Sequence, residues 1–286
     1  MISVMKLDRL QAYVRRLSSG DPQDDFWIDA SGAVVGRFGD SRITSAFQTV
    51  HRVEDGSVVG AQALVRSADT VTGSLSASPW AQLAGRISAE ELVALDRRSR
   101  TVHTLNFFRH DHSPVCLFLC VHDRLLTTVA DNHGRSFRRV LETLGVPQAR
   151  VIIELPAETA SDPTLLANVV ANYRLHGFQV AANFDTAEQL AAVLPAARLD
   201  YLKVDAKRWS TFDAGGGARQ VLAKVRASGT ELILKRVESA SHGDLARACG
   251  ATLVQGYLTA EPVLARDWGA AAPVVRPPRD QGSVPA

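Results

Sequence analysis

Apolar runs alternate with segments of helical periodicity over most of this chain. Strand-like runs lie at 115–122, 150–155, 178–183, 200–204, 231–236 and 252–256, with helical segments between most of them. Two more strands, "AFQTVHRV" and "SVVGAQALVRS", form a hairpin around the turn at Asp55-Gly56. Because the runs are apolar on both faces and joined by helices, they predict a sheet covered by helices. Eight strands of this kind indicate an α/β fold, a closed (β/α)8 barrel.

The two ends of the chain follow other patterns. Residues 4–18 carry Leu and Val at helical spacing, which predicts a short amphipathic helix suited to dimerisation or to docking on a partner. The segment "FWIDASGAVVGRF" predicts a small hairpin around Ser31-Gly32. The last residues are rich in Pro, Ala, Arg and Gly and predict a mostly disordered tail. We therefore expect an N-terminal helix and hairpin extension (1–44), a barrel (45–263) and a tail (264–286).

Composition excludes several classes of function. The 286 residues carry 32 Lys and Arg against 30 Asp and Glu, and the net charge of +2 is too small to argue for nucleic acid binding. No apolar run approaches the roughly 20 residues of a membrane-spanning helix, and the start lacks the apolar core of a secretory signal. We expect a cytoplasmic protein. Cys116, Cys120 and Cys249 lie in apolar segments, so we expect buried, reduced thiols and no zinc site.

Polar side chains follow the predicted strands at the same end of each. In a β/α barrel, the carboxyl ends of the strands converge on one site, so these residues are expected to lie together. They are Gln62, Leu64 and Arg66, then His122, Glu154, Asn183 with Asp185, Lys203 with Asp205, Lys235, Arg236 and Glu238, and finally Gln255 with Tyr257. Core packing does not explain polar groups that recur in this way.

These motifs carry a resemblance to a known family. The order "QALVR", "VHDR", "IELPAE", "GFQVAANFD", "YLKVD", "LKRVES" and "QGYLTAEP" resembles the EAL domain family over about residues 45–263. Members of that family are TIM-like barrels that hydrolyse cyclic di-GMP with bound Mg²⁺ or Mn²⁺. The resemblance implies a TIM-like (β/α)8 barrel of EAL type and a site at its carboxyl end.

Several positions depart from the family's motifs. The metal-binding carboxylate that begins the family's Glu-Ala-Leu motif is Gln62 here, and the Asn expected after the third strand is His122. Glu154 keeps its ligand position, whereas the paired aspartates fall among 182–184, where no register retains both acids. The Glu-Gly of the family's EGVET segment becomes Lys235-Arg236. Two-metal hydrolysis needs several anionic oxygen ligands, so we expect neither bound Mg²⁺ nor Mn²⁺ and no phosphodiesterase activity.

A cationic pocket is expected in place of the metal site. Lys235, with Arg66 and Lys203, would bind phosphate directly, because Arg offers a bidentate fork and Lys a point charge. In the family, the Leu and Arg of the ExLxR segment help to hold the dinucleotide, and Leu64 and Arg66 match them. The candidate nucleotide pocket comprises Gln48, Gln62, Leu64, Arg66, His122, Glu154, Asn183, Lys203, Asp205, Lys235, Arg236, Glu238, Gln255, Tyr257 and Pro262.

Alternatives remain open for both the residues and the function. Lys235 could extend its ammonium to solvent without a ligand, and Arg66 could form a structural ion pair with Glu154 or Glu238. Degenerate relatives serve as cyclic di-GMP receptors or as protein-binding regulators that have lost the nucleotide. We expect an inactive signalling regulator that acts on a protein partner and could bind cyclic di-GMP. The alternatives are a pure interaction module and a phosphodiesterase with an altered metal site, and a homodimer stays open.

Overall fold

The computed structural model describes residues 9–10, 12–13, 25–39, 41–69, 75–76, 87–110, 114–128 and 133–269. The strands are β1 (Phe26–Ile28), β2 (Val34–Phe38), β3 (Ser41–Arg52), β4 (Val58–Asp69), β5 (Leu75–Ser76), β6 (Cys116–Cys120), β7 (Val151–Leu155), β8 (Gln179–Asn183), β9 (Tyr201–Asp205), β10 (Glu231–Lys235), β11 (Leu253–Gln255) and β12 (Val263–Leu264). The α-helices are α3 (Ala89–Phe108), α4 (Asp123–Thr128), α5 (His133–Leu144), α6 (Pro163–Leu175), α7 (Ala187–Val193), α8 (Trp209–Phe212), α9 (Ala218–Ala227) and α10 (Ala240–Cys249), and short 3₁₀ turns are η1 (Gln148–Arg150), η2 (Ala157–Ser161) and η3 (Ala206–Arg208).

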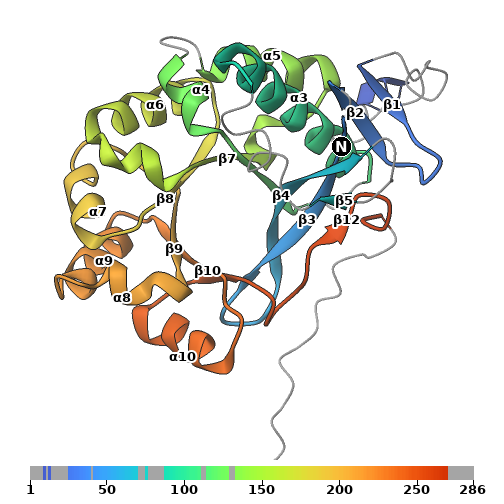
Figure 1. Cartoon of the computed structure of the whole chain (residues 1–286). Helices are drawn as coiled ribbons and strands as arrows, with labels where there is room; N and C mark the ends of the chain where they lie inside the picture. Colours follow the sequence, from blue (N-terminus) through green and yellow to red (C-terminus); the bar gives the residue numbers. More distant parts are fainter. Residues whose placement is uncertain are drawn as a thin grey trace, which may run out of the picture.

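Eight of the strands close into a barrel surrounded by helices (Figure 1). Its order is β3-β11-β10-β9-β8-β7-β6-β4, and pairing of β3 with β4 closes the ring. Each strand pairs in parallel with the next in the series β4, β6, β7, β8, β9, β10 and β11, whereas β3 is antiparallel to both β4 and β11. The predicted barrel is confirmed, because each expected apolar run is a strand of this ring.

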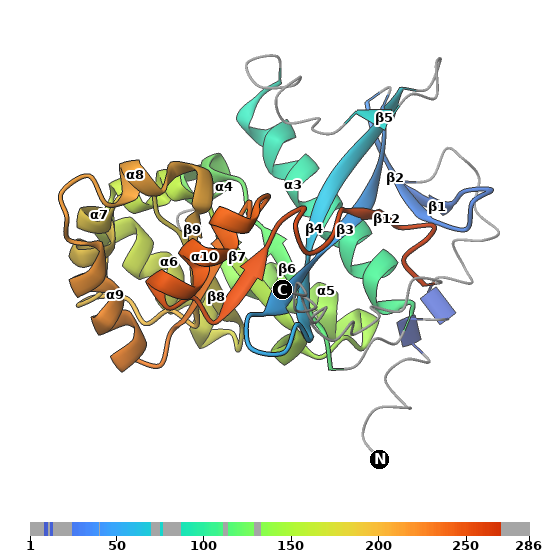
Figure 2. The same ribbon diagram turned by 90° about the horizontal axis from the view of Figure 1, so that it is seen from below.

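The N-terminal hairpin belongs to the same sheet as the barrel. The hairpin predicted around Ser31-Gly32 is formed by β1 and β2, and β2 pairs with β3. Strands β3 and β4 are 12 residues long, so they extend past the barrel and carry the hairpin with them, against α3 (Figure 2). Asn106 of α3 fixes this hairpin, since its side-chain amide donates to Val34 O and accepts from Val34 N, both at 2.8 Å.

Residues near both termini pack onto the barrel. Most of the helix expected at 4–18 lies outside the described residues, but Leu10 is buried in the main core and Tyr13 packs against it. Strand β12 pairs with β3, and Trp268 beyond it is buried against the ring of Phe47. The prediction of a tail from residue 264 is therefore wrong for residues 264–269, because a buried indole ties them to the core.

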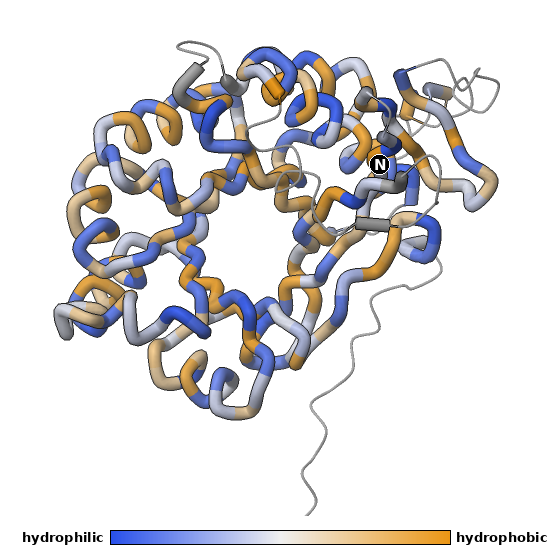
Figure 3. The backbone as a smooth tube through the Cα atoms, viewed as in Figure 1, coloured by the Kyte–Doolittle hydropathy of each residue, from blue (hydrophilic) through white to orange (hydrophobic). Residues whose placement is uncertain are grey.

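Apolar positions follow the barrel strands and alternate with polar positions along the surrounding helices (Figure 3). Strand β7 is buried along its whole length, as expected for a strand covered on both faces. The expectation of buried thiols is wrong in part: Cys120 is exposed, and Cys116 and Cys249 are half-buried, although all three are free. No helix in the described part of the chain is long and apolar enough to span a membrane.

Candidate functional site

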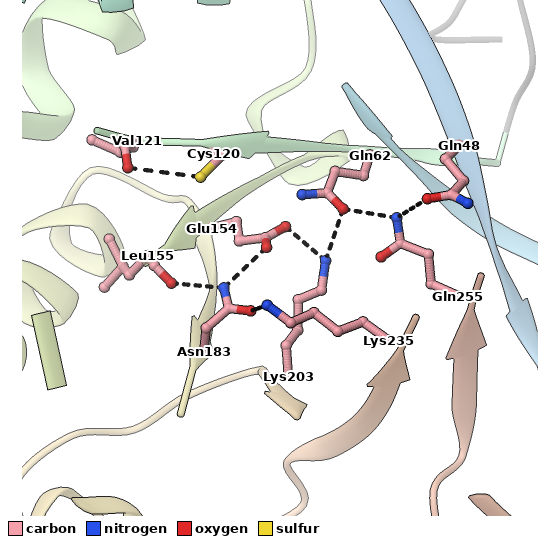
Figure 4. A network of polar contacts seen from close by, with 10 residues as sticks. All are labelled: Gln48, Gln62, Cys120, Val121, Glu154, Leu155, Asn183, Lys203, Lys235 and Gln255. Atoms are coloured by element: carbon pink, nitrogen blue, oxygen red, sulfur yellow. Dashed lines mark hydrogen bonds and ion pairs between the residues drawn. The ribbon is translucent and has the colours of Figure 1, made fainter. Parts of the chain in front are cut away.

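Side chains inside the barrel form two layers, because alternate residues of a strand point to the same face. The lower layer is an apolar cluster of Val50, Phe118, Ile152, Ala181, Ile233 and Leu253. A second layer lies two residues closer to the carboxyl end of the barrel, and each of the eight strands contributes one residue to it. This polar layer consists of Gln48, Gln62, Cys120, Glu154, Asn183, Lys203, Lys235 and Gln255 (Figure 4).

The centre of the polar layer is a buried ion pair between β7 and β9. The Lys203 Nζ atom lies 2.8 Å from Glu154 Oε2, and the two side chains are 0% and 3% exposed. The Lys203 ammonium also lies 5.4 Å from the centroid of the Phe118 ring, a cation–π distance. Gly60 leaves room for that ring, because a Cβ at this position would lie 2.5 Å from a ring carbon. The apolar lower layer therefore contacts the ion pair through the Phe118 ring.

Asn183 links this ion pair to Lys235. Its side-chain Nδ2 donates to Glu154 Oε1 at 3.0 Å and to Leu155 O at 2.9 Å, which leaves Oδ1 as the acceptor for Lys235 Nζ at 2.6 Å. Both neighbours require this orientation of the amide, because a carboxylate accepts and an ammonium donates. The Lys235 ammonium bonds to Asn183 inside the barrel, which argues against the alternative in which it simply extends to solvent.

Three glutamine side chains complete the layer on the opposite side. Gln62 Oε1 accepts from Lys203 Nζ at 3.3 Å and from Gln255 Nε2 at 2.7 Å. Gln255 Nε2 also donates to Gln48 Oε1 at 3.2 Å, and Gln48 Nε2 donates to Ala260 O at 3.0 Å. Because Lys203 can only donate, it fixes the orientation of Gln62 and, through it, that of Gln255. Pro262 lies two residues beyond Ala260 and is half-buried.

Burial and charge oppose each other at the ion pair. Burial alone would raise the pKa of Glu154, but Lys203, Lys235 and the Asn183 amide hold that pKa below its usual value. Burial lowers the pKa of Lys203, although Glu154 acts in the opposite direction. Glu154 is ionised at neutral pH, and with two ammonium groups facing one carboxylate the layer carries a net positive charge.

Several predicted site residues lie at the mouth but outside this network. Their partners are local: Arg236 pairs with Asp205 at 3.1 Å, Glu238 with Lys207 at 2.6 Å, and the His122 ring with Asp123 at 2.6 Å. Glu154 and Glu238 thus take lysines as partners, and the suggested Arg66 ion pair with either stays an untested alternative. The cationic pocket stays a prediction: Glu154 neutralises Lys203, so the net positive charge of the layer comes from Lys235.

Arg66 and Leu64 follow Gln62 on the same face of β4, beyond the ring of strands. Arg66 is half-buried, its guanidinium donates to Val65 O at 3.0 Å, and burial lowers its pKa while the nearby Tyr257 acts in the opposite direction. Tyr257 itself is 62% exposed, beside the exposed Leu258. Arg66 and Tyr257 therefore form one side of the mouth above the polar layer.

The oxygen atoms of the polar layer do not fit a divalent metal ion. Glu154 supplies its carboxylate, but one oxygen accepts from Lys203 and the other from Asn183. In the described part of the chain, no three His, Cys, Asp or Glu side chains are grouped to hold a metal. An ammonium at ~4 Å from a divalent ion costs about 8 kcal/mol of repulsion for an effective dielectric near 20. The cations of this layer therefore oppose a bound metal.

Sequence reasoning missed Cys120, which occupies the β6 position of the polar layer. Although the residue keeps exposed surface, its thiol is desolvated among these groups, and this desolvation, with a further contribution from Glu154, raises the pKa of the thiol to about 12, so the thiol stays protonated. The signal was present in the alternation of β6, where Cys116, Phe118 and Cys120 share the inner face. An apolar run alone did not distinguish this position from the core.

An eight-stranded barrel with one polar-layer residue on each strand is the architecture of barrels that bind ligands at their carboxyl ends. The chain belongs to the EAL domain family, since the EAL domain model matches residues 34–262. A search of curated proteins gave no match.

Solved structures with this fold include several EAL proteins. The Klebsiella pneumoniae BlrP1 manganese/cyclic di-GMP complex is 20% identical with a TM-score of 0.64, covering 78% of this chain and 56% of that one. Bacillus subtilis YkuI, in complex with substrate c-di-GMP and calcium, is 21% identical with a TM-score of 0.63, covering 77% and 56%. The Pseudomonas aeruginosa FimX EAL domain bound to c-di-GMP is 18% identical with a TM-score of 0.64, covering 79% and 93%. The chain thus spans little more than half of BlrP1 and YkuI.

Proposed function

We propose that this protein is a cytoplasmic EAL-type signalling regulator that binds cyclic di-GMP without hydrolysing it and acts on a protein partner. The observation that carries this proposal is the engagement of both Glu154 oxygens by nitrogen donors, Lys203 at 2.8 Å and Asn183 at 3.0 Å. Hydrolysis with two metal ions needs free anionic oxygens to hold the metals and activate water. This layer has one carboxylate, which is already neutralised.

Recognition of the nucleotide is supported by groups above the polar layer. BlrP1, YkuI and FimX carry cyclic di-GMP in their structures. Here, Leu64 and Arg66 lie at the mouth on the same face of β4 as Gln62, where a half-buried guanidinium can form a bidentate contact with a phosphate. Exposed Tyr257 offers an aromatic face beside it.

A pure protein-interaction module is the second candidate. The observation that favours it is internal pairing, since Arg236 and Lys207 at the mouth already have carboxylate partners in Asp205 and Glu238. A ligand would have to compete with these contacts. In that case the surface of the barrel, including the exposed Leu258, would serve the partner alone.

Calorimetric titration with cyclic di-GMP in the presence of EDTA distinguishes the two candidates. We expect micromolar or tighter binding, weakened at least tenfold by Arg66→Ala, because a charge-assisted bidentate contact is lost. The matched control is Arg37→Ala, which removes an exposed arginine of β2 away from the barrel. The absence of heat with the wild-type protein, both in EDTA and in Mn²⁺, would support the pure interaction module instead.

A hydrolysis assay with Mn²⁺ tests the lack of catalysis separately. We expect no linear dinucleotide from the wild-type protein. Linear product that disappears in Glu154→Ala would show a phosphodiesterase with an altered metal site.

A further inference from the structure

Lys235 differs from its neighbours Lys203 and Arg236 in what it faces. Lys203 lies against Glu154, and Arg236 against Asp205. In the part of the chain that the structure describes, the Lys235 ammonium has a neutral amide oxygen, Asn183 Oδ1, as its hydrogen-bond partner. A lysine ammonium has three donors, so this contact leaves two of them for another acceptor.

Gln255 provides a second, independent indication of a ligand beside Lys235. The two residues are direct partners in the register of β10 and β11. Gln255 is 3% exposed, and its Oε1 is a buried acceptor without a hydrogen-bond partner among the described residues. Its Nε2 is held by Gln62 and Gln48, so the amide cannot turn around to satisfy this oxygen. In Figure 4 the oxygen points into the space enclosed by the layer, toward the lysines.

We propose that Lys235 is a built-in cation that supplies, for a phosphodiester bound at the mouth, the positive charge that a metal ion would otherwise supply. Gln255 Oε1 accepts from a hydroxyl or N–H group of the same ligand, so the ligand class is a phosphodiester with an adjacent donor, as in a nucleotide. This inference rests on the proposed function and adds to it: binding needs no divalent metal, and it depends on Lys235 in particular. An uncompensated ammonium suits an anion, because it brings charge without a desolvated partner that must first be displaced.

The test compares Lys235→Met with Lys224→Met in calorimetric titrations with cyclic di-GMP in EDTA. Lys235→Met keeps an unbranched side chain as far as Cε and removes the ammonium, and we expect a 10- to 100-fold loss of affinity, typical of a charge-assisted hydrogen bond. Lys224→Met removes an exposed lysine of the outer helix α9, outside the candidate pocket, and should change affinity less than about threefold. Wild-type affinity should be the same with EDTA and with Mn²⁺.

The outcomes separate the two proposals. No binding by the wild-type protein overturns the proposed function and this inference together. Wild-type binding that Lys235→Met leaves unchanged, or that requires Mn²⁺, overturns this inference alone and leaves nucleotide binding in place. Lys235→Gln is a second uncharged variant for the case in which the Met variant does not fold, and Lys235→Arg should retain most of the affinity because it retains the charge.

Discussion

Replacing Glu154 by Gln tests the buried ion pair at the centre of the site. The substitution keeps the shape of the side chain and removes the charge that compensates Lys203, whose side chain is 0% exposed. Removing one member of a buried ion pair leaves an uncompensated charge and costs about 3–5 kcal/mol. We therefore expect Glu154→Gln to lower the free energy of unfolding by this amount at neutral pH.

Urea denaturation followed by circular dichroism measures this cost. With an m value near 3 kcal/mol/M, typical of the upper end for single domains, the midpoint should fall by about 1 M or more. The double variant Glu154→Gln/Lys203→Met should recover most of the loss, because no charge is then left buried. Glu238→Gln is the matched control, since its pair with Lys207 is 31–40% exposed and should contribute less than about 1 kcal/mol.

The pH dependence of the variant adds a second check. Burial lowers the pKa of Lys203, and without Glu154 nothing at this distance opposes it. A lysine with a lowered folded-state pKa destabilises the fold below that pKa, and stability rises with pH from there up to the unfolded value of 10.5. Glu154→Gln should therefore be less destabilising at high pH. A loss below 1 kcal/mol at neutral pH, or a double variant no more stable than the single one, would refute the ion pair's role.

Three further changes test other parts of the structure. Burial lowers the pKa of His103 to about 3 from 6.5, so the free energy of unfolding should fall by about 1.4 kcal/mol per pH unit as the pH drops below 6.5. The acid unfolding profile of His103→Gln should lack this slope, and a profile identical to that of the wild-type protein would contradict the assignment. Arg236 has φ 57°, so Arg236→Gly should raise stability by about 1 kcal/mol in thermal unfolding, and a decrease would refute backbone strain. Leu10→Ala should cost about 2–5 kcal/mol in urea, whereas no loss would show that Leu10 is not packed.

The barrel could be predicted from sequence because each strand is a local apolar run. Strand β7, for example, is buried from Val151 to Leu155, and its composition alone indicates a strand covered on both faces. The packing of Trp268 could not be predicted, because its aromatic partner Phe47 lies far away in the chain and the surrounding Pro and Gly residues suggested a tail.

The site was predicted as a set of strand ends but not as a set of contacts. Their position at the strand ends placed Lys203 and Lys235 at the same end of the barrel, and both belong to the polar layer. Lys203 is the lysine that is neutralised, because Glu154 lies within reach on β7, two strands away from β9. That proximity depends on the register of the strands around the ring. The pattern of one strand carries no information about that register.

Direct titration with Mn²⁺, followed by the electron paramagnetic resonance signal of the free ion, tests the central claim that cations hold this site in place of a metal. We expect the wild-type protein to leave the signal unchanged at equimolar metal, and Lys235→Glu/Asn183→Asp, which adds two carboxylates beside Glu154, to reduce it. Stoichiometric binding of Mn²⁺ by the wild-type protein, lost in Glu154→Gln, would contradict the account.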